Sequence, residues 1–214
     1  MLQQNTRRAA TNGASRLALL ASPMVALVLM SATAVNSAGP QATLAPPEGF
    51  AGISDTAARS AALFTEAGKV LTSRRCVNCH PAGDRPLQGE EGRLHQPPVE
   101  RRVDGFGAAT MRCSTCHQAA NFDPAGVPGN PHWHLAPREM GWQGKTIDEI
   151  CAQIKDPSRN GARSLQQIQA HLADDPLVGW AWAPGFGRGR APGTQKQLAA
   201  LIEAWLNTGA ECPK

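Results

Sequence analysis

The sequence predicts a mostly α-helical fold with extensive coil, formed as a single domain. Apolar residues recur at helical spacing in four segments, and no segment shows the alternation typical of a half-buried strand. The chain has 21 glycines and 17 prolines, nearly a fifth of its 214 residues, and they gather between the helical segments. Few aromatic residues and no tyrosine are present. We therefore expect short helices joined by long loops.

Residues 1–38 have the pattern of a secretory signal peptide. Three arginines precede an apolar run at 17–30, and no acidic residue occurs before Glu48. Small residues at Ala34 and Ala38 then offer cleavage sites. The run is shorter and more interrupted than the ~20 apolar residues of a membrane span, although an uncleaved anchor is the alternative. The pattern predicts export to the periplasm.

The charge of the mature chain is close to neutral. The formal net charge of +4 includes three arginines of the predicted leader, so cleavage leaves about +1. Such a balance does not favour nucleic acid as a partner.

The predicted domain begins after an extended arm. Residues 39–54 are rich in proline, alanine and glycine without periodicity, which predicts a flexible arm ahead of a domain at 55–214. The first helix is expected at 55–73, where apolar residues recur at helical spacing. These residues are Ala57, Ala61, Phe64 and Leu71.

Two further helices are predicted after residue 145. Thr146 and Glu149 form a capping box that begins the first, and Cys151 lies on its apolar face. The second is expected at 164–173, with His171 at the margin of its apolar face.

The last helix is predicted to begin at Thr194 and to stop at Gly209, which places Cys212 just beyond its end. The remaining stretches are rich in glycine and proline and are expected to be loops. They are residues 81–108, 119–145 and 174–193.

Two five-residue segments carry the same C-x-x-C-H motif. They are Cys76-Val77-Asn78-Cys79-His80 and Cys113-Ser114-Thr115-Cys116-His117. Two thiols spaced by three residues can add to the two vinyl groups of a haem, and the following histidine can reach its iron. The motifs thus predict two covalently attached c-type haems (heme c), with His80 and His117 as proximal ligands. Paired cysteines also occur in zinc sites and redox dithiols, but a histidine directly after each pair favours haem.

Cys151 and Cys212 remain outside the motifs. In an oxidising compartment they are expected to form a disulfide that closes a loop of ~60 residues. The alternative is that Cys151 is a buried apolar residue or a thiolate ligand to iron.

Each iron needs a sixth ligand if it is to be six-coordinate. His132 and His134 flank Trp133 in a loop soon after the second motif. We expect this segment to supply the distal ligand of the haem at Cys113 and Cys116, with His134 favoured over His132. The alternative is that both are surface residues.

Other candidates for the sixth position are spread along the chain. His95 lies between the motifs, His171 lies on a helix margin, and Met140 offers a thioether that would raise the potential of its haem. Either histidine is alternatively a surface or packing residue. Met111 is too close to Cys113 to reach the distal face of that haem and is expected to be a packing residue. The tryptophans are expected to pack against the haems; they are Trp133, Trp142, Trp180, Trp182 and Trp205.

The chain resembles the dihaem c-type cytochromes, on the basis of its two C-x-x-C-H motifs. It is also similar to small exported cytochrome chains labelled as subunits of isoquinoline 1-oxidoreductase and related molybdenum hydroxylases. That second resemblance rests on the segments 131–137, 140–145, 155–157, 160–161 and 209–213. It implies a redox partner with a molybdenum cofactor. Because this chain has no motif for molybdopterin or an iron–sulfur cluster, substrate oxidation would belong to the partner.

These features predict a periplasmic electron-transfer protein rather than an enzyme. The alternative is a haem enzyme, a peroxidase or a thiosulfate-oxidising cytochrome, with one open or cysteine-ligated iron. A haem-based sensor is disfavoured because the sequence has no output domain.

Overall fold

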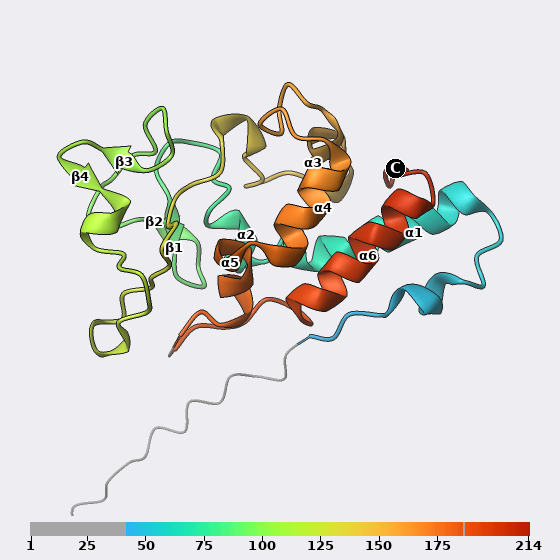
Figure 1. Cartoon of the computed structure of the whole chain (residues 1–214), viewed down its shortest axis with the longest axis horizontal. Coiled ribbons are helices and arrows are strands. Elements are labelled where there is room, and N and C mark those ends of the chain that lie inside the picture. Colours follow the sequence, from blue (N-terminus) through green and yellow to red (C-terminus); the bar gives the residue numbers. More distant parts are fainter. Residues whose placement is uncertain (1–41, 186) are drawn as a thin grey trace, which may run out of the picture. The chain divides into compact units, whose positions relative to one another are not determined.

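Four helices form the main body of the fold, at the positions that the sequence predicts. They are α1 at Thr56–Leu71, α3 at Ile147–Lys155, α4 at Leu165–Asp174 and α6 at Gln195–Asn207 (Figure 1). This computed structural model describes residues 42–185 and 187–214, which lie within one compact unit. The predicted signal peptide and residues 39–41 of the arm lie outside the described residues. Within the described part, no helix has the length and apolar character needed to cross a membrane.

The predicted helix starts are confirmed by their caps. The Asp55 carboxylate accepts a hydrogen bond from the amide of Ala58 at 2.7 Å. The Ser164 amide donates to the Gln167 side chain at 2.8 Å, and the Gln167 amide donates back to the Ser164 hydroxyl at 3.2 Å. These side chains satisfy amides that have no partner within the helix.

Helix α1 packs against α6 to form the centre of the core. Phe64 and Trp205 meet with ring centroids 4.7 Å apart, and both side chains are fully buried. The Ser60 hydroxyl donates to the Trp205 carbonyl and accepts from the amide of Glu211 at 2.9 Å, which fixes the end of the chain against α1. Helix α4 packs on the same helix α6.

The expected disulfide is present in the structure. Cys151 of α3 is bonded to Cys212, which follows α6. It joins α3 to the end of the chain, beside the contact between Ser60 and Glu211. The pairing leaves the four cysteines of the C-x-x-C-H motifs free.

Two small hairpins correct the expectation that the chain has no strands. Strand β1 at Leu87–Gln88 pairs antiparallel with β2 at Arg93–Leu94, and β3 at Gly107–Ala108 pairs antiparallel with β4 at Met111–Arg112. Strands of two residues are too short to produce a visible alternation in the sequence. The prediction of a mostly helical fold with extensive coil is otherwise confirmed.

The stretch 174–193, expected to be a loop, contains helix α5 at Pro176–Gly179 followed by the turn η5 at Trp180–Trp182. Asp175 caps α5 by accepting from the Leu177 amide at 2.8 Å. The remaining short helices are η1 at Pro47–Phe50, α2 at Arg74–Val77, η2 at Cys113–Thr115, η3 at Asp123–Ala125 and η4 at Arg138–Met140.

The expected flexible arm is packed against the domain over residues 42–54. Leu44 is 4% exposed and belongs to the hydrophobic core. The Ala45 amide donates to the Glu66 carboxylate at 2.8 Å, and the Gly193 amide donates to the Ala42 carbonyl at 2.9 Å. Residues 42–54 are therefore packed on the domain, with Leu44 in its core, although the segment has the composition of a linker.

Candidate functional site

The two C-x-x-C-H motifs adopt the same backbone turn. In the first, the amides of Cys79 and His80 both donate to the carbonyl of Cys76, each at 3.1 Å. The second motif repeats these two bonds at 3.2 and 2.9 Å. One helical turn thus holds both thiols and the imidazole of each motif.

The His80 ring is fixed with one nitrogen free. Its Nδ1 lies 2.7 Å from the carbonyl oxygen of Met140. A carbonyl only accepts, so Nδ1 carries the proton and Nε2 keeps its lone pair. The ring stacks on Trp142 at 3.6 Å between centroids with 7° between the planes. Burial lowers the pKa of His80 to about 3, which keeps the imidazole neutral and able to coordinate a metal.

The His117 ring has the same surroundings. Its Nδ1 lies 2.7 Å from the carbonyl oxygen of Pro128, which again leaves Nε2 free. Trp133 stacks on it with 4.7 Å between centroids and 15° between planes. Burial also lowers the pKa of His117. Each motif histidine is therefore oriented by a backbone carbonyl and covered by one tryptophan.

A glycine follows each residue that supplies the orienting carbonyl. Gly141 comes after Met140, and a Cβ atom there would lie 2.8 Å from the Pro81 carbonyl oxygen. Gly129 comes after Pro128, and a Cβ atom there would lie 2.1 Å from the Ala120 carbonyl oxygen. Both loops thus approach the chain just beyond a motif so closely that only glycine fits. Sequence reasoning missed these two glycines, because nothing in the sequence shows which backbone they approach.

Two adjoining cavities surround the motifs. The larger cavity, of about 460 Å³, is lined by Cys113, Cys116 and His117 of the second motif. The smaller cavity, of about 120 Å³, is lined by Cys76 and His80 of the first. Four residues line both cavities: Arg75, Cys79, His134 and Trp180. Groups bound in the two cavities would therefore lie close together.

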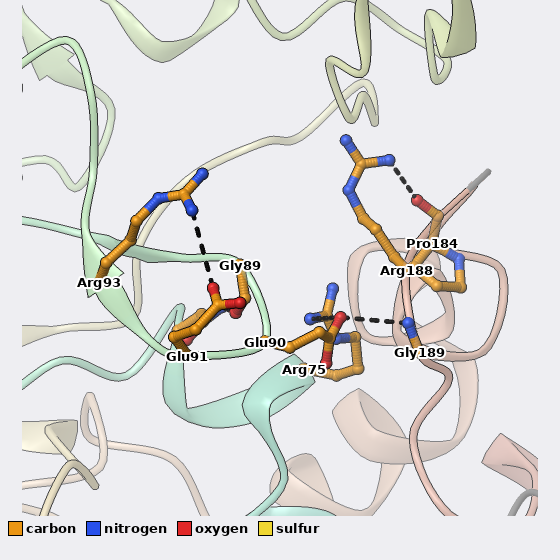
Figure 2. Close-up of polar contacts among 9 residues, drawn as sticks. Arg75, Gly89, Glu90, Glu91, Arg93, Pro184, Arg188 and Gly189 are labelled. Carbon is orange, nitrogen blue, oxygen red and sulfur yellow. Dashed lines mark hydrogen bonds and ion pairs between the residues drawn. The ribbon is translucent and has the colours of Figure 1, made fainter. Parts of the chain in front are cut away.

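Arginines are the only charged residues among the described lining of the larger cavity; they are Arg74, Arg75, Arg93, Arg112 and Arg188. Burial, followed by the nearby charge of Arg75, lowers the pKa of Arg188. Glu90 offsets part of this positive charge, since its carboxylate accepts from Arg75 at 2.7 Å and from the Gly189 amide at 3.1 Å (Figure 2). Arg93 also pairs with Glu91 at 3.7 Å, and Arg112 pairs with Asp104 at 2.5 Å. The positive charge that remains on the wall suits a ligand that carries carboxylates.

Arg75 also retains an unused donor. The residue is only 7% exposed, and its Nε has no hydrogen-bond partner. A buried unpaired donor is costly in a folded protein unless a ligand satisfies it. Sequence reasoning missed this residue, for which the only signal was its place directly before Cys76.

The residue types at each motif fit a covalently attached haem, although the smaller cavity offers much less room than the larger one. Each of the two cavities has a thiol pair and an imidazole on one turn. The unpaired Nε–H of Arg75 suits a haem propionate. Burial raises the pKa of Cys76 to about 12 and that of Cys79 to about 11. A redox dithiol needs a lowered thiol pKa, so these values disfavour that alternative at the first motif, whereas a neutral thioether is compatible with burial. Among the described residues, no three His, Cys, Asp or Glu side chains are grouped to hold a metal ion on their own.

The predicted sixth ligands are distributed unevenly around the cavities. His95 lines the larger cavity, His171 the smaller one and His134 both. His171 Nδ1 lies 2.9 Å from the Asp175 carboxylate, a contact that orients its ring. His132 is exposed and lines neither cavity.

Met140 is buried and also lines the smaller cavity, and its backbone carbonyl accepts the proton of His80 Nδ1. Met140 therefore remains a candidate for the sixth position in the smaller cavity, together with His134 and His171.

Two packing expectations are wrong. Met111 is 44% exposed, at the edge of the larger cavity, because the short strand β4 holds it outside the core. Trp205 packs on Phe64 in the core, and Trp182 donates to the Pro192 carbonyl at 3.0 Å; neither lines a cavity. The other three tryptophans do line the cavities.

No protein-family model matches the chain, and neither a curated protein nor a solved structure is similar enough to match it.

Proposed function

We propose that the mature chain is an exported dihaem c-type cytochrome that passes single electrons. The observation that carries this proposal is the repeated arrangement at the two motifs. His80 and His117 each donate from Nδ1 to a backbone carbonyl at 2.7 Å and stack on a tryptophan. Such outer hydrogen bonds fix the tautomer and orientation of a metal-binding histidine. Haem iron, when bound, supplies the one-electron couple.

The adjoining cavities support electron transfer over catalysis. Residues shared by both walls would keep the two haems near each other, which suits electron hopping between them. Cys151 is bonded to Cys212, so it is not available as the thiolate ligand of a thiosulfate-oxidising cytochrome. Cys116 is exposed, so the second haem would approach the surface, where a partner can exchange electrons with it.

We propose a dehydrogenase of the molybdenum hydroxylase class as the redox partner, following the sequence resemblance. In such a pair the partner oxidises the substrate, and this chain accepts the electrons one at a time in the periplasm.

A redox titration of the mature holoprotein, followed optically, tests this function. We expect two reversible one-electron steps, both irons low-spin, and no turnover of hydrogen peroxide. Rapid peroxide turnover by a protein with one high-spin iron would show that the chain is a haem enzyme instead.

A further inference from the structure

The imidazole rings of His95 and His117 lie near each other within the larger cavity. Their ring centroids are 5.9 Å apart, and both residues line the cavity. With metal–nitrogen bonds of about 2 Å, two imidazoles on one iron have ring centres about 6 Å apart. The two rings thus already have the spacing of a pair of axial ligands.

The free nitrogen of each ring also suits this role. Nδ1 of His95 lies 3.0 Å from the Pro97 carbonyl oxygen, just as Nδ1 of His117 lies 2.7 Å from that of Pro128. Because a carbonyl only accepts, both Nδ1 atoms carry the proton and both Nε2 atoms keep their lone pairs.

The backbone of His95 is held at three points. Its amide donates to the Pro86 carbonyl at 2.9 Å. Its own carbonyl accepts two bonds from the Arg85 guanidinium, at 3.1 Å from Nε and at 2.7 Å from a terminal nitrogen. His95 directly follows strand β2, so the β1–β2 hairpin fixes where its ring enters the cavity. A ligand held in this way needs little further ordering to bind iron.

We propose that His95 is the distal ligand of the haem attached at Cys113 and Cys116, which makes that iron six-coordinate with two histidines. This inference rests on the proposed function. It replaces the expectation that His134 has this role. The His132–His134 segment contributes Trp133, which stacks on His117. His134 Nδ1 lies 2.5 Å from the His132 carbonyl oxygen, so its Nε2 is free as well, and its ring packs against Phe106 at 4.9 Å between centroids. The spacing to the His117 ring is therefore the observation that favours His95.

The test is the paramagnetic-resonance and optical spectrum of the mature His95→Ala holoprotein. We expect both haems to stay attached, about half of the low-spin signal to be lost, and a high-spin signal to replace it. Added imidazole should restore the low-spin signal by entering the space that the side chain leaves. The matched control is His132→Ala, an exposed histidine that lines neither cavity, and it should leave the spectrum unchanged.

A second variant, His95→Met, keeps a ligand at the same position. We expect it to remain low-spin and to raise the potential of one haem. The inference is overturned if His95→Ala keeps both irons low-spin, or if His95→Met leaves both potentials unchanged. If the low-spin signal decreases in His134→Ala but not in His95→Ala, His134 is the distal ligand instead of His95. Absence of covalent haem from the wild-type chain would instead overturn the proposed function.

Discussion

Arg75 brings a buried positive charge to the wall that both cavities share. Its guanidinium pairs with Glu90, lies 5.8 Å from the Trp180 ring centroid, and keeps one donor unused. A fixed cation stabilises the reduced form of a nearby iron, whose net charge is less positive, and it offsets the propionate charges. We therefore expect Arg75 to affect the redox potential of the proposed haems as well as their binding.

We predict that Arg75→Gln lowers at least one haem potential. A lost charge interaction of about 1 kcal/mol corresponds to roughly 40 mV for a one-electron couple. Spectroelectrochemistry of the holoprotein measures this shift in potential. Arg102→Gln is the control, because the Arg102 side chain is 61% exposed and lines neither cavity. Potentials that stay unchanged or rise in Arg75→Gln would contradict a role for this charge.

At the scale of elements, the loop at residues 138–143 holds the His80 ring in place. The amides of Trp142 and Gln143 both donate to the His80 carbonyl, while the Met140 carbonyl accepts from the ring. Gly141 lies between these contacts, against the backbone of Pro81 and Ala82. Rigid backbone on both sides leaves no room for a side chain.

We predict that Gly141→Ala destabilises the fold by roughly 1–3 kcal/mol, since backbone atoms must move to admit the methyl group. It should also change the spectrum of the haem on the first motif. Gly83→Ala is the control, because a Cβ atom there meets nothing within 4 Å. Guanidinium denaturation of both variants measures the difference. Equal stability of the two variants would mean that the loop is not held as described.

The sequence predicted the helices better than the site. Local signals such as Asp55 and Ser164 determine where helices begin, and these starts were correct. The hairpins and α5 were missed because each element is too short to show a period. The orienting contact between His80 and Met140 joins residues 60 apart in the chain. No local pattern reveals such a pair, and the same is true of the distance between His95 and His117.

At the scale of the whole molecule, the disulfide joins two parts of the core that are distant in sequence. Cys151 and Cys212 are 61 residues apart and connect α3 to the end of the chain.

We predict that the double variant Cys151→Ala with Cys212→Ala loses about 4 kcal/mol of unfolding free energy, because its unfolded chain is less restricted. Denaturation measures this loss, and alkylation before and after reduction should differ by two thiols in the wild type. An unchanged midpoint in the variant would contradict a stabilising role for the bond.

The covalent attachment of two haems is the central claim about the molecule, and the mature protein isolated from the periplasm tests it directly. The measurement is the intact mass after denaturation, together with the pyridine haemochrome spectrum. We predict a mass above that of the polypeptide by two haem groups and a spectrum of two c-type haems per chain. Cys76→Ala with Cys79→Ala should remove one of them, and Cys113→Ala with Cys116→Ala the other. A wild-type mass equal to that of the bare polypeptide would contradict the account.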